Sequence, residues 1–339
     1  MRIEHDIPLG PLTTFKIGGN ARLYTRVSTL DDLKAAVGYA HALDIPIFIL
    51  GGGSNVLISD KGFSGLVIQP VFTGISCDSI VDRGECVAHA GDIWDDVVKA
   101  SVQYGLSGLE NLSLIPGTLG GAVVQNIGAY GTELERVFVW ADVFDMRTGE
   151  IIRLHKIDCD FGYRSSIFKT PEGRNYIVIK AAFKLIKNIP PDISYKDLQI
   201  YFTEQKNSHP SIQEVRDAVI AIRTEKLPDL SRLGSAGSFF KNPVIEKVHA
   251  DQLSKKYPNM PVFPISDEMV KVSAAWIIDN ICKLRGYREG DAGISPVQAL
   301  VLVNYGKATA SDISSLAKKI IEAVYSATSI RLEPEVESV

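Results

Sequence analysis

The segment that most constrains the fold is an apolar run that ends in three consecutive glycines. The run IPIFIL (45–50) is typical of a short buried strand, and GGGSN (51–55) follows it directly. Because glycine has no Cβ, the amides of such a loop can turn toward an anion, as in phosphate-binding loops. The pattern is neither a G-x-G-x-x-G fingerprint nor a P-loop, and a tight turn between two strands explains it about as well.

A second glycine-rich loop lies further along the chain. The segment IPGTLGGAVVQNIGAYG (115–131) holds five glycines among apolar residues. Two such loops suggest a large, flat, partly anionic ligand that lies against backbone, and a dinucleotide cofactor fits this description. Because the chain has no Rossmann fingerprint, a conventional nicotinamide-binding domain is not expected.

The stretch GSAGSFFKNP (234–243) combines small residues with two aromatic side chains. Glycine weakens both helices and strands, so we expect a loop here that something large approaches closely. The small residues end at Ser238, which raises the question of what would need a hydroxyl group at that position.

Length and charge set the remaining bounds. A chain of 339 residues favours two or three domains. A net charge of −4 gives no reason to expect nucleic acid, which favours basic surfaces. The charged start MRIEHDIPLG and the lack of an apolar run of about 18 residues predict a cytoplasmic protein with no membrane partner.

Cysteine and histidine spacing indicates neither a disulfide scaffold nor a metal centre. The four cysteines show no CxxC pair, so we expect buried free thiols. The six histidines are scattered and form no HExxH motif, so we expect no metal.

Periodicity predicts a mixed α+β class. A stop before Pro228 places the best domain boundary at 226–229. The predicted helices follow Thr29, start at Trp94, run from Ile212 to a stop before Pro228, or span 272–284 and 311–328; the predicted strands span 66–69, 86–90, 137–145, 176–186 and 298–304.

Eight motifs together resemble the UDP-N-acetylenolpyruvoylglucosamine reductase (UDP-N-acetylmuramate dehydrogenase) family, in the subtype with an extra tyrosine loop. They occur in order and cover the chain from end to end: TTFKIGG, LGGGSN, ENLSLIPGTLGG, QNIGAYG, FGYRSSIFK, KLPD, GSAGSFFKNP and LEPEV. The resemblance implies non-covalent FAD, NADPH as reductant, small-molecule partners only, and a monomer. It also implies reduction of UDP-N-acetylglucosamine enolpyruvate to UDP-N-acetylmuramate in peptidoglycan precursor synthesis.

The same resemblance implies a domain plan. A two-part FAD-binding domain of the PCMH/vanillyl-alcohol-oxidase-like type would span 1–227, with subdomains at about 1–70 and 71–227, and the segment 329–339 would complete it. A smaller α+β substrate-binding domain would span 228–328. The family usually continues past LEPEV through a basic and apolar strand, and here Glu337, Ser338 and Val339 follow instead.

The implied chemistry is hydride delivery from flavin N5 to the terminal carbon of the enolpyruvyl double bond, followed by protonation of the neighbouring carbon. Ser238 matches the family's proton donor. Arg164 matches the arginine at the substrate carboxylate, where a guanidinium fork suits two oxygens. Glu335 matches a carboxyl group that, when protonated, donates a hydrogen bond to the developing charge, and Glu333 is a competing assignment.

Further positions are implied to bind ligands. Tyr195 matches a tyrosine that closes over the substrate. Gly121 stands where some relatives have serine, so any flavin contact there would involve backbone. The other implied substrate residues are Tyr130, Lys226, Asn242, Lys271 and Gln298; the implied flavin residues are Gly51, Gly52, Gly53, Ser54, Asn55, Ile115, Gly117, Thr118, Gly121, Asn126 and Gly128.

Two other functions stay open at this point. Another FAD-dependent oxidoreductase or oxidase on the same flavin-binding scaffold would bind flavin without depending on Ser238. A catalytically silent nucleotide-sugar binder would bind no flavin at all.

Overall fold

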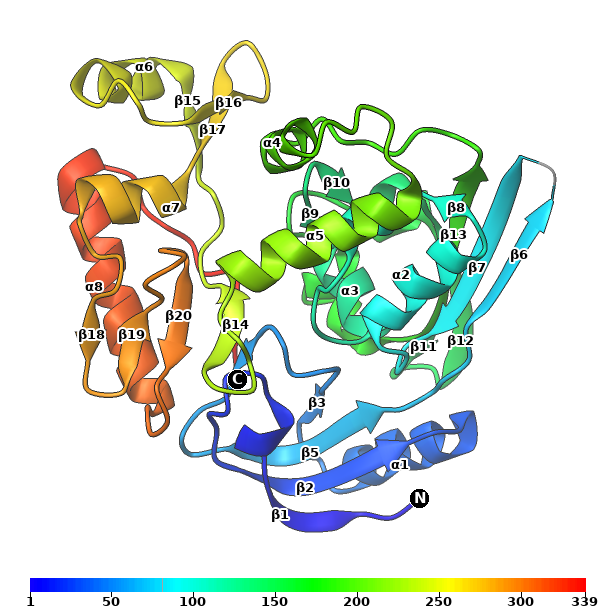
Figure 1. Cartoon of the computed structure of the whole chain (residues 1–339). Helices are drawn as coiled ribbons and strands as arrows, with labels where there is room; N and C mark the ends of the chain where they lie inside the picture. Colours follow the sequence, from blue (N-terminus) through cyan, green and yellow to red (C-terminus); the bar gives the residue numbers. More distant parts are fainter. Residues whose placement is uncertain (81) are drawn as a thin grey trace. The chain divides into compact units, whose positions relative to one another are not determined.

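The chain forms two compact units, each assembled from separated stretches of sequence (Figure 1). The computed structural model describes residues 1–80 and 82–339. Unit 1 holds residues 1–7, 21–52 and 64–225, and unit 2 holds residues 8–20, 53–63 and 226–339. Both units mix helices and sheets, which confirms the predicted α+β class. The boundaries near 227 and 328 stay a prediction.

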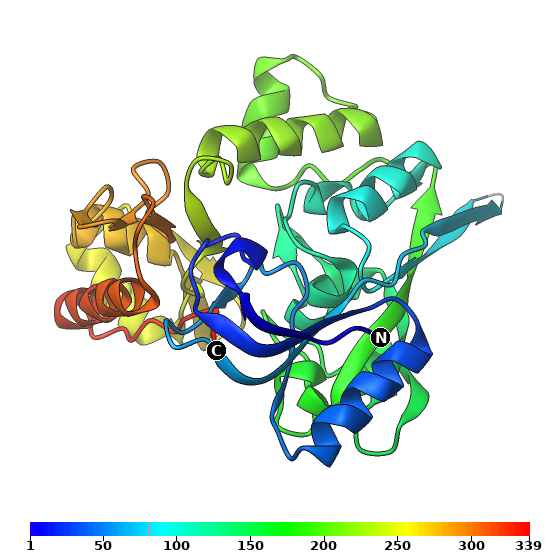
Figure 2. The same cartoon turned by 90° about the horizontal axis from the view of Figure 1, so that it is seen from below.

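The first sheet of unit 1 has the strand order β1-β2-β5-β3, and Figure 2 shows helix α1 beside it. Thr29 caps this helix as predicted, because its side chain accepts the Asp32 amide. β3 pairs in parallel with β5 and is shorter and less buried than the predicted 45–50 strand. The elements are β1 (Glu4–Pro8), β2 (Asn20–Val27), α1 (Leu30–Ala42), β3 (Ile47–Ile49) and β5 (Phe63–Pro70).

The second sheet of unit 1 is antiparallel, in the order β12-β11-β13-β7-β6, and β8 also pairs with β13. Trp94, at the start of α2, is fully buried and packs edge-on against Phe183 of β13. The elements are β6 (Ser76–Ile80), β7 (Arg83–His89), α2 (Trp94–Gln103), β8 (Leu106–Ser107), α3 (Leu119–Gln125), β9 (Gly128–Ala129), β10 (Thr132–Glu133), β11 (Phe138–Asp145), β12 (Glu150–His155) and β13 (Tyr176–Lys187).

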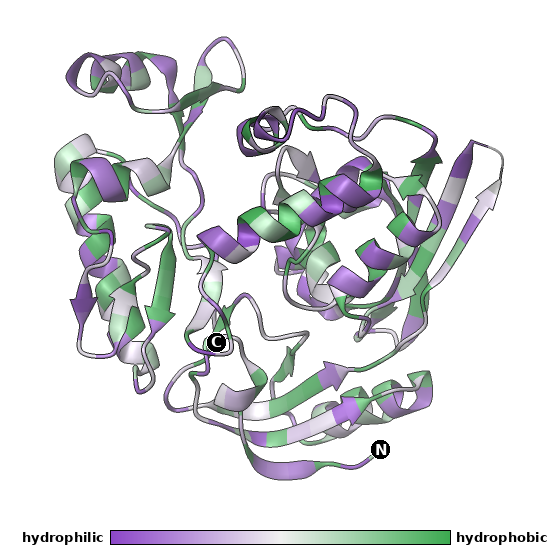
Figure 3. Cartoon of the chain, viewed as in Figure 1, coloured by the Kyte–Doolittle hydropathy of each residue, from purple (hydrophilic) through white to green (hydrophobic). Residues whose placement is uncertain are grey.

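Two further helices of unit 1, α4 (Lys196–Glu204) and α5 (Ile212–Lys226), pack together around a small apolar cluster. Leu198 and Phe202 of α4 contribute to it, as do Val215 and Val219 of α5. α5 carries both hydrophobic and hydrophilic residues in Figure 3, and its buried apolar residues follow helical spacing, as predicted for an amphipathic helix.

Unit 2 contains a four-stranded sheet in the order β14-β20-β19-β18, with the long helix α8 beside it (Figure 1). A three-stranded sheet, β15-β17-β16, adjoins α6, and the last strand β21 pairs in parallel with β4. The elements are β4 (Val56–Leu57), β14 (Gly234–Ser238), β15 (Val244–Glu246), α6 (Lys247–Lys256), β16 (Val262–Pro264), β17 (Met269–Val272), α7 (Ala274–Trp276), β18 (Arg288–Glu289), β19 (Ala292–Ile294), β20 (Val301–Asn304), α8 (Ala310–Thr328) and β21 (Glu337–Ser338).

Two predictions for unit 2 need correction. The stretch 234–238 is a strand rather than a loop, because β20 supplies its hydrogen-bond partners. Its glycine serves a β-bulge: the pairing shifts between Ser235 and Ser238, and Gly237 adopts φ +73°. The helix predicted over 272–284 is shorter, since α7 continues only as a π-helix over Ile277–Ile281.

The prediction of four free thiols was wrong for two of them. Cys77 on β6 lies directly opposite Cys86 on β7, and the pair forms a disulfide. Spacing alone did not reveal this pair, because its cysteines meet only when the two strands form a hairpin. Cys159 and Cys282 are free thiols, and burial raises the pKa of Cys159 to about 12.

The disulfide can be tested by counting the cysteines that alkylation modifies. Unfolding the protein without reductant and alkylating it should modify two cysteines, Cys159 and Cys282, and prior reduction should raise the count to four. Cys77→Ser should lower the free energy of unfolding by about 2 kcal/mol, because a closed loop constrains the unfolded chain. Cys282→Ser is the matched control and should change stability little. Four modified cysteines without reductant would contradict the pairing.

Candidate active site

The two glycine-rich loops contact each other within unit 1. A Cβ on Gly52 would lie 2.6 Å from the Cα atom of Gly117, and one on Gly51 would lie 3.1 Å from Oγ1 of Thr118. This oxygen is buried and has no hydrogen-bond partner among the described residues. A buried hydroxyl without a partner costs free energy, so this contact leaves a polar position for a ligand to satisfy.

The second loop is tied to the FGYR motif. Asn126 ends α3 in a left-handed conformation with φ +44°. Its Nδ2 donates to the Gly162 carbonyl at 2.9 Å, and its Oδ1 accepts from the Glu135 amide at 3.1 Å. This buried side chain therefore fixes the loop against the turn that carries Arg164.

Arg164 itself lies in a strained tight turn. Gly162 and Ser165 pair across the turn, and Arg164 between them has φ +53°. Such a conformation is uncommon for residues other than glycine and clusters at functional sites. Its Nη2 donates to the carbonyl of Gly128 at 2.6 Å. The structure thus brings together Arg164 and Gly128, two of the predicted site residues.

Tyr130 and Tyr195 also meet in unit 1. Their ring centroids are 5.3 Å apart with an interplanar angle of 76°, an edge-to-face contact. Burial raises the pKa of Tyr130 to about 12, and burial also raises the pKa of Tyr195. Both phenols therefore keep their protons near neutral pH and can donate hydrogen bonds.

In unit 2 the bulge determines which serine is accessible. Ser235 is 1% exposed, and its hydroxyl accepts the Gly237 amide at 3.1 Å. Ser238 comes directly after the bulge and is exposed, whereas Phe239 and Phe240 are buried again. Of the two serines, only Ser238 presents its side chain to solvent.

Glu335 lies on the strand-like segment next to Ser238. Its amide donates to the Phe239 carbonyl at 2.8 Å, and its carbonyl accepts Nδ2 of Asn55 at 3.1 Å. Both backbone groups of this half-buried residue are therefore held in place. The competing acid, Glu333, is 76% exposed and pairs with Lys241 at 3.7 Å, which makes Glu335 the better candidate.

The other predicted residues of unit 2 are spread around β14, β15 and β17. Gln298 precedes β20, the partner strand of Ser238. Oδ1 of Asn242 accepts the Ala274 amide at 3.0 Å, and Lys271 pairs with Val244 across β15 and β17. Lys226 is the last residue of α5.

Sequence reasoning missed a buried ion pair behind the second glycine loop. Arg216 of α5 donates to both carboxylate oxygens of Asp95 at 2.8 and 2.7 Å, and its Nη1 also donates to Oγ of Ser113. Burial acts to raise the pKa of Asp95, but the bonds from Arg216 and from the Leu114 amide outweigh it and hold that pKa below its ordinary value. No local pattern links residues 121 positions apart.

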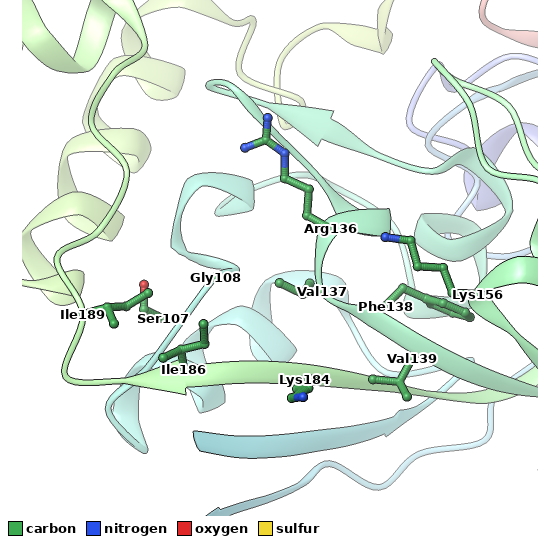
Figure 4. A pocket seen from close by; sticks show the side chains of 10 residues that line it. All are labelled: Ser107, Gly108, Arg136, Val137, Phe138, Val139, Lys156, Lys184, Ile186 and Ile189. Carbon is green, nitrogen blue, oxygen red and sulfur yellow. The ribbon is translucent and has the colours of Figure 1, made fainter. Parts of the chain in front are cut away.

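A hollow of about 450 Å³ in unit 1 involves none of the predicted residues. Figure 4 shows the ten residues that line it, from Ser107 to Ile189.

In the part of the chain that the structure describes, no group of His, Cys, Asp and Glu could hold a metal ion. No helix formed by these residues is long and apolar enough to cross a membrane.

Comparison with known proteins accounts for both units. Residues 229–339 match the family model "UDP-N-acetylenolpyruvoylglucosamine reductase, C-terminal domain", and residues 21–155 match "FAD binding domain". A UDP-N-acetylenolpyruvoylglucosamine reductase from Pasteurella multocida is 40% identical over 328 residues, which are 97% of this chain and 94% of that protein. One from Pseudomonas syringae pv. syringae is 39% identical over 341 residues, covering 99% and 98%.

A solved structure is also similar over the whole length. The crystal structure of UDP-N-acetylenolpyruvylglucosamine reductase from Thermus caldophilus matches with a TM-score of 0.70 and 28% identity. The match covers 100% of this chain and 99% of that one.

The contact between the glycine loops predicts a sharp difference among glycines. Gly52→Ala should lower the free energy of unfolding by about 1–3 kcal/mol, because its Cβ would collide with backbone. Gly121→Ala, in the first turn of α3, should be neutral to slightly stabilising, since a Cβ there meets nothing within 4 Å. Gly38→Ala, at an exposed position inside α1, should stabilise by about 0.5–1 kcal/mol. Denaturant unfolding checks all three, and a neutral Gly52→Ala would contradict the contact.

Proposed function

The chain belongs to the UDP-N-acetylenolpyruvoylglucosamine reductase family, and on that premise we propose that NADPH is its reductant and that Ser238, Arg164 and Glu335 perform the chemistry. It is an FAD-containing oxidoreductase that reduces UDP-N-acetylglucosamine enolpyruvate in peptidoglycan synthesis. The observation that carries this function is the 40% identity across 97% of the chain. FAD, when bound, supplies the hydride for the terminal carbon of the enolpyruvyl double bond.

The residues of the glycine loops fit such a cofactor. The unpartnered Oγ1 of Thr118 and the closely apposed backbone at Gly52 and Gly117 suit a ligand that binds mainly through amides and small hydroxyls. The residues that would hold FAD are Gly51, Gly52, Gly53, Ser54, Asn55, Ile115, Gly117, Thr118, Gly121, Asn126 and Gly128.

Ser238 donates the proton to the carbon next to the one that receives hydride. A serine hydroxyl is a weak acid in water, but a carbanion-like carbon is basic enough to take its proton. The exposed position of Ser238 supports this role, whereas the hydroxyl of Ser235 is buried and bonded to the Gly237 amide.

Arg164 and Glu335 stabilise charge as it develops on the substrate carboxylate. A guanidinium carries N–H donors in a fixed fork that matches two carboxylate oxygens. The turn at 162–165 and the bond to Gly128 hold this fork in one orientation. Glu335, when protonated, donates a hydrogen bond to the same charge, and its fixed backbone next to Phe239 supports that role.

The remaining substrate contacts belong to the same proposal. Tyr195 closes over the substrate, and the ring of Tyr130, with its phenol protonated, lies against the ring of Tyr195. Lys226 and Lys271 supply positive charge for the diphosphate, and Asn242 and Gln298 supply amide groups. The enzyme acts as a cytoplasmic monomer on small molecules.

One experiment separates this function from that of another flavin-dependent oxidase. NADPH consumption by the purified protein should require UDP-N-acetylglucosamine enolpyruvate and should yield UDP-N-acetylmuramate. Consumption that continues without the enolpyruvate, with oxygen as the acceptor, would instead identify an oxidase.

Ser238→Ala gives the sharpest test of the proton donor. Reduction of the oxidised enzyme by NADPH should be unchanged, because that step precedes protonation of the enolpyruvyl group. Oxidation of the reduced enzyme by the enolpyruvate should slow by about 10²- to 10⁴-fold, as deletion of a general acid commonly does. Rapid-mixing absorbance at the flavin band follows each half-reaction separately.

Ser235→Ala is the matched control, because it removes the same hydroxyl group three residues earlier. It should lower stability through the lost bond to Gly237, yet leave the oxidation by enolpyruvate nearly intact. If Ser235→Ala slows that step and Ser238→Ala does not, the proton donor is Ser235.

A further inference from the structure

One buried asparagine connects the two tyrosines of unit 1. Asn111 is 2% exposed and lies in the short 3-10 turn Glu110–Leu112. Its Nδ2 donates to the Tyr130 carbonyl at 3.0 Å and to the Asp192 carbonyl at 2.9 Å. An amide nitrogen carries two N–H donors, so these two bonds use both of them.

Asp192 connects the Asn111 hydrogen bond to the turn before Tyr195. Its Oδ1 accepts the Ser194 amide at 2.9 Å, which forms a turn immediately before Tyr195 begins α4. Burial acts to raise the pKa of Asp192, but the bonds from Ser194 and the charge of Arg136 outweigh it and hold the pKa below its ordinary value, so the turn keeps its acceptor. These bonds hold the backbone of Asp192 and the turn that leads into Tyr195.

Elsewhere the segment is held by Ile193, which packs against the apolar cluster of α4 and α5, and by one weak surface pair. Arg136 and Asp192 are 3.9 Å apart and about half exposed, and such surface pairs contribute little stability. Ile189, just before the segment, lines the hollow of about 450 Å³ together with Ile186 and Ser107 (Figure 4). The start of the segment is thus not close-packed against β13.

We propose that Asn111 is a positioning residue that sets the resting place of Tyr195 and thereby the affinity for substrate. It holds the backbone at Tyr130 and at Asp192 with a single nitrogen, so the two tyrosine rings keep their edge-to-face contact. This inference rests on the proposed function, which places Tyr195 over the substrate.

The first test needs no turnover. Asn111→Asp keeps the volume of the side chain and Asn111→Leu keeps only its branched shape, being larger; both remove the two donors, and the new carboxylate also repels two carbonyl oxygens. Hydrogen exchange at the amides of Ser194 and Gln199, which bond to Asp192 and Tyr195, should become about tenfold faster in both variants of the holoenzyme, with α1 unchanged. Arg136→Gln is the control at the surface pair and should leave this exchange within about twofold. Unchanged exchange in the Asn111 variants would overturn the proposal.

The second test asks whether the two hydrogen bonds of Asn111 affect substrate binding. In both Asn111 variants KM for UDP-N-acetylglucosamine enolpyruvate should rise about 5- to 30-fold while kcat stays within about threefold, the result expected from losing one or two buried hydrogen bonds. In a Tyr195→Ala background the same Asn111 changes should add less than about twofold. An equal rise in KM in both backgrounds shows that Asn111 does not act through Tyr195 and overturns the proposal.

Two remaining outcomes are also decisive. If both Asn111 variants fail to fold or to retain flavin, Asn111 supports the core of unit 1 and the positioning role is wrong. If the wild-type protein does not turn over the enolpyruvate, the proposed function fails. The exchange measurement alone then decides whether Asn111 holds the segment before Tyr195 in place.

Discussion

Unit 1 depends on the burial of one polar segment, Glu110–Ser113, whose side chains must find all their partners inside the protein. The Glu110 carboxylate accepts the Ser107 hydroxyl and the Gly108 amide, both at 2.6 Å. Ser113 donates to the Glu110 carbonyl and accepts from Arg216. A buried charge without partners costs several kcal/mol, so the segment is stable only when β8, α5 and residues 192–195 supply partners to it. The second glycine loop begins two residues after this segment, and the amide of the intervening Leu114 donates to Asp95, the partner of Arg216.

Elements with a strong local signal could be predicted from sequence. Helices α1 and α8 carry threonine caps and apolar faces, and β11 and β13 are mostly apolar segments with few charged residues. These local patterns can be recognised without knowledge of distant residues. The stretch 234–238 was mispredicted because its strand character comes from β20, more than 60 residues away. The disulfide was missed for the same reason, since its two cysteines become neighbours only through strand pairing.

The same distinction between local and long-range information holds for the candidate site. Its residue types were recognised by resemblance, but the reasons for their placement are non-local. Ser238 is exposed because of a bulge that exists only in register with β20. Arg164 is oriented by the carbonyl of Gly128, 36 residues away, and Asn111 bonds to carbonyls at separations of 19 and 81 residues. Periodicity carries no information over such distances, so these contacts required the folded structure.

The pairing of β4 with β21 has a consequence for how the protein is made. Val56 and Leu57 leave the ribosome roughly 280 residues before Glu337 and Ser338, so at 5–20 residues per second they wait about 15 to 55 seconds for their partner strand. Phe15, in the core of unit 2, waits for Phe239, which is made roughly 220 residues later, or about 11 to 45 seconds at the same rates. By then the ribosome has made the whole sequence of unit 1, which ends at residue 225. Synthesis therefore passes through a stage at which unit 1 can fold while early apolar segments of unit 2 remain uncovered, and uncovered apolar surface favours aggregation of the nascent chain.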